Sequence, residues 1–89
     1  MFRVEWLEVA SDELARLWVP ADAALRQELT AASHEIDRRL ERDPHHEGES
    51  RPGGRRLTFA APLAVTFRVE TDGKTVTVLD VLLFRRHRK

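Results

Sequence analysis

The chain has 89 residues, of which 42% are hydrophobic and 34% charged, and its formal net charge is zero. This size suits a single domain, residues 1–89, with one modest core, and the composition excludes disorder and a membrane protein as default classes. No apolar run approaches the length of a membrane span, and charges interrupt the apolar pattern of residues 1–9, so a soluble cytoplasmic protein is expected. The absence of cysteine excludes disulfides, thiolate zinc sites and a cysteine nucleophile.

The two signs of charge are unevenly distributed along the chain. Residues 1–50 hold 6 basic and 12 acidic side chains, a balance of −6, whereas residues 51–89 hold 9 basic and 3 acidic side chains, a balance of +6. Such opposed blocks form a charge dipole that can steer a polyanionic or acidic partner to one end of a molecule. Alternatively, acidic helices and basic strands neutralise each other across the fold.

The N-terminal region predicts a strand followed by a short helix. Phe2, Val4 and Trp6 alternate with charged residues, which is typical of a half-buried strand over residues 2–7. Ser11 is placed as an N-cap for a helix that ends near Trp18, because two carboxylates follow it and a proline comes soon after the helix.

A longer second helix is predicted from Asp22, its N-cap, to Arg42. One apolar stripe runs along it at spacings of four, three, four and four residues, through Leu25, Leu29, Ala32, Ile36 and Leu40. The helix ends at Asp43-Pro44, since a residue before proline avoids the α region.

Residues 43–54 (DPHHEGESRPGG) have no periodicity and the composition of a mobile loop. Alternation then predicts a strand around Leu57 and Phe59 and another over residues 63–70. Asp72-Gly73 predicts a hairpin with a two-residue turn that pairs residues 63–70 with the apolar, β-branched run 75–84. This last strand should form the centre of the sheet.

The predicted hairpin register creates a conflict at Asp80. Pairing outward from the turn sets Asp80 opposite Val65, on the face that carries Phe67 and Val78, where a lone carboxylate is costly. Either Asp80 has a basic partner or a β-bulge at Leu79 or Asp80 restores the alternation; the bulge is the favoured interpretation.

The elements predict an α+β fold of order β-α-α-β-β-β, with two helices packed on one face of a mainly antiparallel sheet. The other face should be polar and basic. By the predicted alternation it holds Arg56, Thr58, Ala64, Thr66, Arg68 and Thr77. Together with Arg51, Arg55 and the basic tail 85–89 (RRHRK), this face is a candidate cradle for phosphates.

This pattern resembles the RelE/ParE superfamily of bacterial type II toxin–antitoxin toxins over nearly the whole chain. The resemblance lies in the helix ending LERDP, the GRRLTF strand, the PLAVTFRVETDGKTVTVLDV hairpin and the ending FRRHRK. It implies a cytoplasmic toxin, of a kind also linked to plasmid stabilisation, that a cognate antitoxin protein neutralises. The RelE-like branch implies a ribosome-dependent endoribonuclease acting on mRNA, and the ParE-like branch an inhibitor of DNA gyrase.

The resemblance also implies roles for individual residues. RNA cleavage needs a group to activate the 2′-hydroxyl, cations to stabilise the developing charge and an acid for the leaving oxygen. The implied catalytic residues are His87 as acid or base and Arg56 and Arg85 as phosphate ligands. The candidate substrate-binding residues, taken from this resemblance together with the predicted basic face and tail, are Arg51, Arg55, Arg68, Arg86, Arg88 and Lys89.

Two departures from the RelE-like pattern keep an alternative open. Ala64 stands where those toxins place an arginine, and the chain has no tyrosine, the residue with which they often end. A non-catalytic ParE-like or degenerate member, which binds a gyrase-like protein target or only an antitoxin, is therefore the competing hypothesis.

Several candidate residues also have purely structural interpretations. The tail 85–89 can serve solubility alone, and Arg55 and Arg56 can form surface salt bridges with helix carboxylates. His45-His46 lies near Glu47 and Glu49, but adjacent histidines in a loop lack fixed ligand geometry, so no metal and no cofactor are expected. Trp6 and Trp18 are predicted core anchors because each lies on the apolar phase of its element.

Overall fold

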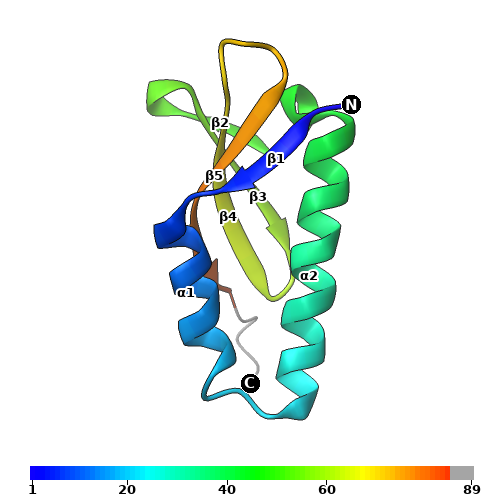
Figure 1. The fold of residues 1–89 in the computed structure, drawn as a ribbon, viewed down its shortest axis with the longest axis vertical. Helices are drawn as coiled ribbons and strands as arrows, with labels where there is room; N and C mark the ends of the chain where they lie inside the picture. The colour runs from blue at the N-terminus through cyan, green and yellow to red at the C-terminus, as the bar shows by residue number, and fades with distance from the viewer. Residues whose placement is uncertain (85–89) are drawn as a thin grey trace.

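The computed structural model describes residues 1–84, in which two α-helices cover one face of a five-stranded sheet (Figure 1). The helices are α1 (Glu8–Trp18) and α2 (Ala23–Arg42), and the strands are β1 (Arg3–Trp6), β2 (Glu49–Arg51), β3 (Arg55–Ala60), β4 (Leu63–Val69) and β5 (Thr75–Leu83). The strand order is β1-β5-β4-β3-β2, with β1 parallel to β5 and all other pairs antiparallel. The predicted α+β class, with both helices on a mainly antiparallel sheet, is confirmed.

The core lies between the helices and one face of the sheet. From α2 it receives the predicted apolar stripe, of which Leu29, Ala32, Ile36 and Leu40 are buried. They pack with sheet residues that include Val65, Phe67, Val76 and Val78. Strand β5 lies inside the sheet, between β1 and β4, but the prediction that it forms the centre is wrong by one strand: β4 is central, because β2 adds a strand at the other edge. In the described residues no helix is both long and apolar enough to cross a membrane.

The helix starts differ in how well the sequence predicted them. Asp22 caps α2 as expected, its carboxylate accepting a hydrogen bond from the Leu25 N–H at 2.8 Å. The prediction that Ser11 caps α1 is wrong, because α1 begins at Glu8 directly after β1. There the Leu7 N–H donates to the Val78 carbonyl at 3.0 Å, so the sheet holds the chain where it turns into the helix.

The tryptophans also have different environments. Trp6 packs against the core and its Nε1–H donates to Asp37 at 2.8 Å, which ties β1 to α2. Trp18 is not a core anchor as predicted: it is 38% exposed, and the Arg26 guanidinium lies 5.3 Å from its ring centroid.

The bulge predicted in the last strand is confirmed. Arg68 pairs with Thr77 and Phe67 with Val78, but Thr66 pairs with Asp80, so Leu79 is the extra residue. Asp80 thereby shares a face with Thr66 instead of Val65, and Val81 returns to the core. The Val81 N–H donates to the Glu13 carboxylate of α1 at 2.9 Å, which satisfies a backbone donor beside the irregularity.

The hairpin has the predicted register but a different turn. Residue Gly73 is the one position in the turn with positive φ (70°), so Asp72-Gly73 does not form the predicted two-residue turn. Instead the Gly73 N–H donates to the Glu70 carbonyl, and the Asp72 carboxylate accepts from the N–H groups of Lys74 and Thr75. Because Val69 still pairs with Val76, the longer connection leaves the strand register unchanged.

The Asp72 turn should make stability depend on pH. The Lys74 N–H, then the Thr75 hydroxyl, hold the pKa of Asp72 below its ordinary value of 3.8. A depressed folded-state pKa stabilises the protein above the unfolded value and loses that effect as pH falls through the folded value. Asp72→Asn should therefore lower the urea midpoint at pH 6, and the difference from wild type should shrink below about pH 4. A difference that stays constant from pH 6 to pH 2.5 would contradict this assignment.

Residues 43–54 are not the irregular loop that the sequence predicted. They contain two short 3-10 turns, at Pro44–His46 and Pro52–Gly54, and the edge strand β2 between them. Gly48 makes this path possible: its φ is +70°, and a Cβ there would lie 2.1 Å from the Leu57 carbonyl oxygen. The segment thus belongs to the sheet and brings Arg51 into it.

Candidate functional site: a row of arginines on the open face of the sheet

Three predicted substrate-binding residues share one row on the sheet face opposite the helices. Arg51 of β2 pairs with Arg55 of β3, which pairs with Arg68 of β4. Directly paired residues on adjacent strands place their Cβ atoms about 5 Å apart, so three guanidinium groups project from a narrow band. We call these residues the arginine row. Adjacent like charges repel, so an anion bound between them is favoured.

The members of the arginine row differ in how their charge is balanced. The Arg51 guanidinium forms an ion pair with the Glu49 carboxylate at 3.1 Å, and the Arg68 guanidinium forms one with the Glu70 carboxylate at 3.2 Å. The Arg55 Nε donates to the Pro52 carbonyl at 3.2 Å, and within residues 1–84 no carboxylate forms an ion pair with it. Arg55 is therefore the member with its charge most available to a ligand.

Glu70 partly neutralises one end of the arginine row. Its carboxylate accepts from the hydroxyl of Thr77, which lies next to Arg68 in the same row, and from the Arg68 guanidinium. The Thr77 hydroxyl and then Arg68 hold the pKa of Glu70 below its ordinary value of 4.5. A phosphate that approaches Arg68 must compete with a carboxylate that is charged at neutral pH.

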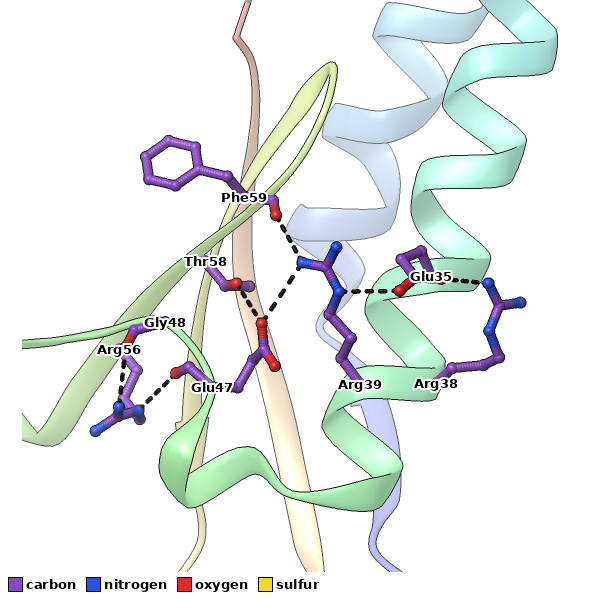
Figure 2. A network of polar contacts seen from close by, with 8 residues as sticks. All are labelled: Glu35, Arg38, Arg39, Glu47, Gly48, Arg56, Thr58 and Phe59. Atoms are coloured by element: carbon purple, nitrogen blue, oxygen red, sulfur yellow. Dashed lines mark hydrogen bonds and ion pairs between the residues drawn. The ribbon is translucent and has the colours of Figure 1, made fainter.

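Arg56 and Thr58 do not lie on the open face, so their predicted placement is wrong. They pair with Phe67 and Val65, whose side chains are in the core, and paired residues share a face. The Arg56 guanidinium donates to the carbonyls of Glu47 at 2.9 Å and Gly48 at 3.2 Å (Figure 2). Arg56 holds the start of β2 and is separated from the arginine row by the sheet itself.

A second arginine, which the sequence analysis did not single out, ties the same segment to α2. Arg39 donates from Nε to Glu35 at 3.0 Å and from a terminal nitrogen to the Phe59 carbonyl at 2.7 Å (Figure 2). The same nitrogen lies 3.5 Å from the Glu47 carboxylate, which also accepts from the buried Thr58 hydroxyl at 2.8 Å. This network fixes β2 and β3 against the helix and so fixes two of the three row positions.

Apolar side chains occupy the far end of the open face. Phe59 pairs with Ala64, and Ala64 pairs with Leu82, so these three residues form a second row, the apolar row. Phe59 and Leu82 are 45% and 64% exposed, whereas Ala64 between them is only 7% exposed. Phe84 follows β5, and its ring centroid lies 5.2 Å from that of Phe59.

The other predicted site residues fall on the tail. Arg85, Arg86, His87, Arg88 and Lys89 lie outside the residues that the structure describes. In the described chain, the loop histidines contact other groups: His46 lies 3.0 Å from the Asp43 carboxylate, and His45 contacts the Phe2 ring edge to face. No group of three potential metal ligands occurs in residues 1–84.

Comparison with known proteins identifies the fold through structure alone. No family model matches the chain, and no curated protein matches its sequence. A chain of the RelBE2 toxin–antitoxin complex from Mycobacterium tuberculosis is similar in structure, with a TM-score of 0.68 and 20% identity, covering 94% of this chain and 98% of that one.

Two further solved structures are similar over nearly their full length. A chain of the chromosomal ParDE toxin–antitoxin system from P. aeruginosa has a TM-score of 0.65 and 18% identity, covering 96% of this chain and 98% of that one. The isolated RelE toxin from E. coli has a TM-score of 0.63 and 16% identity, covering 98% and 88% respectively. The resemblance seen in the sequence is thus confirmed at the level of structure: this chain has the fold shared by the RelE and ParE toxins.

Proposed function

We propose that this protein is the toxin of a bacterial type II toxin–antitoxin pair, neutralised in the cytoplasm by a cognate antitoxin protein. The support is the fold, which it shares with toxins from three bacterial species, two of them solved within toxin–antitoxin complexes. The single observation that carries the choice of ligand is the arginine row on the open face. A band of three guanidinium groups across three strands suits the phosphate backbone of RNA.

In the RelE-like form of this proposal, the protein cleaves mRNA on the ribosome. The arginine row would bind RNA phosphates, assisted by Arg86, Arg88 and Lys89, while Arg85 stabilises the developing charge and His87 moves the proton. Arg56 is left out of the contact set because its guanidinium is bound to two backbone carbonyls on the covered face.

One observation favours the second candidate, a non-catalytic protein that binds a gyrase-like target or only its antitoxin. Ala64 stands where the RelE-like pattern has an arginine, and it is almost fully buried between Phe59 and Leu82. Around Ala64 the open face is therefore apolar, which weakens charge stabilisation there and leaves the chemistry to the tail.

The proposal is tested by induced expression in a bacterial host. Wild type should arrest growth, and replacing Arg51, Arg55 and Arg68 together with glutamine should abolish the arrest without changing the circular dichroism spectrum. The matched control replaces three exposed helix arginines, Arg16, Arg38 and Arg42, and should still arrest growth. If wild type leaves growth untouched, the toxin assignment is wrong; if both triple variants arrest growth equally, the arginine row is not the contact.

Catalysis is tested separately with purified protein, ribosomes and mRNA. Wild type should cleave the message only when ribosomes are present, and His87→Ala should reduce the rate by about 100-fold or more, the range for loss of a general acid or base. Equal cleavage by both proteins would exclude the role of His87. Growth arrest without cleavage by either protein would select the non-catalytic candidate.

A further inference from the structure

We propose that Phe59 and Phe84 form a stacking site for an unpaired nucleobase, on the same sheet face as the arginine row. The inference rests on the proposed RNA contact and adds to it a base-binding subsite at the opposite end of the face. We call these two residues the aromatic pair. Their ring centroids are 5.2 Å apart, with an angle of 57° between the ring planes.

Both rings of the aromatic pair are unusually exposed to solvent for phenylalanine side chains. Phe59 is 45% exposed and Phe84 51% exposed, and Leu82 beside them is 64% exposed. Single exposed apolar residues are common on protein surfaces, whereas apolar residues that gather on one face are typical of a binding surface. Phenylalanine is also costly to leave in water, because removing its ring from water is favourable.

Hydrogen bonds anchor the backbone at both ring-bearing residues. The carbonyl of Phe59 accepts from Arg39 at 2.7 Å, and the N–H of Phe84 donates to the Pro62 carbonyl at 2.6 Å. Ala64, which separates Phe59 from Leu82 in the apolar row, has only a methyl group, so no long side chain stands over the rings from the middle strand. Because the backbone at both residues is already anchored, less conformational entropy is lost when a ligand binds.

The charges around the face indicate how a single strand would lie. Arg55 and Phe59 are four residues apart on β3, which corresponds to roughly 13 Å along the strand. Asp80 lies in the row between them, paired with Thr66, and disfavours a phosphate at that point. Beyond Phe84, an open depression of about 550 Å³ is lined by residues that include Asp22 and Glu28, which also repel phosphate.

These positions favour RNA over a protein segment as the occupant. Phosphates are attracted to the arginine row and repelled from both flanks of the aromatic pair, so the pair is left to contact a base. Base–aromatic stacking tolerates any sequence because every base has a π-face. An apolar protein segment would use Leu82 as readily as the two rings and would not depend on their aromatic character.

The test compares two single-stranded probes with the full-length protein: fluorescein-labelled hexaadenylate and an abasic oligoribonucleotide with the same number of phosphates. Wild type should bind hexaadenylate about tenfold more tightly or better, the range for stacking one base. The double variant Phe59→Leu, Phe84→Leu keeps the apolar surface but lacks aromatic faces, so it should bind both probes equally. Val9→Ala, Val19→Ala, which alters exposed apolar residues of the helical region, should keep the preference.

The arginine row provides an independent readout. Replacing Arg51, Arg55 and Arg68 with glutamine should weaken the binding of both probes. It should also reduce the slope of the logarithm of the binding constant against the logarithm of the salt concentration by about 2. The preference for hexaadenylate over the abasic probe should remain. Equal binding of the two probes by wild type, or an unchanged preference in the leucine variant, overturns the stacking site. Failure of wild type to bind either probe at low salt overturns the RNA contact as well, and the surface is then a protein-binding one.

Discussion

Gly48→Ala should destabilise the protein by about 3 kcal/mol. The new Cβ would lie 2.1 Å from the Leu57 carbonyl oxygen and 2.9 Å from the Thr58 Cβ, so backbone or strand must move. The φ of +70° adds a further penalty of about 1 kcal/mol for a residue with a Cβ. For a domain of this size the loss corresponds to a fall in melting temperature of roughly 15 °C, measurable by thermal unfolding.

Gly73→Ala is the matched control for this prediction. Its φ is also +70°, but an added Cβ would have no heavy atom within 4 Å. The variant should therefore lose only about 1 kcal/mol, from backbone strain. If the two alanine variants unfold at the same temperature, the close approach of Gly48 to β3 does not contribute, and the tight packing of residues 47–51 on the sheet is disproved.

Arg39→Met should lower the free energy of unfolding by about 2 kcal/mol, measured by urea denaturation at pH 7. Methionine keeps much of the apolar stem but leaves the Phe59 carbonyl and the part-buried Glu47 carboxylate without their charged donor. Loss of a hydrogen bond to a charged group costs about 1.5–3 kcal/mol. Because β2 depends on the same contacts, amide hydrogen exchange in Glu49–Arg51 should also accelerate.

Arg38→Met provides the control on the neighbouring residue. Arg38 pairs with the same Glu35 carboxylate, but its side chain is 61% exposed and has no contact with β3 (Figure 2). Exposed ion pairs contribute little, so this variant should unfold at the wild-type urea concentration. Equal losses in the two methionine variants would show that the effect comes from Glu35 and not from the link between α2 and β3.

The elements predicted correctly are those whose local patterns had one consistent solution. The stripe from Leu29 to Leu40 fits only a helix with one buried face, and α2 has that face buried against the sheet. The bulge at Leu79 followed from a conflict within the sequence, because an unpaired carboxylate at Asp80 could not share a face with Phe67. In both cases the cost of burial favoured the observed structure over its alternatives.

The face of β3 was predicted wrongly because hydrophobicity alone was used to orient it. Leu57 and Phe59 are apolar, yet it is Thr58 and Ala60 that are buried, while Phe59 is 45% exposed. Thr58 can be buried because its hydroxyl donates a hydrogen bond to the Glu47 carboxylate, and Arg56 can face the covered side because two backbone carbonyls accept hydrogen bonds from it. These hydrogen-bond partners come from residues 47–48, and no local sequence pattern predicts them.

The strand β2 was missed for a related reason. Glu49–Arg51 is a three-residue polar strand without alternation, and its position depends on Gly48 packing against Leu57 and on Arg39 from α2. An edge strand that buries no side chain lacks the hydrophobic alternation by which a strand is predicted from sequence.

By itself the sequence determined the fold class, the long helix, and the register and bulge of the last hairpin, because burial costs along each element allow few alternatives. Its motifs separately carried the resemblance to the RelE and ParE toxins. It also supplied the arginines of the candidate site. Only the tertiary structure decided which of them lie together: pairing across β2, β3 and β4 aligned Arg51, Arg55 and Arg68 and turned Arg56 to the opposite face. Strand pairing joins residues distant in the chain, and one position of shift exchanges the two faces of a strand.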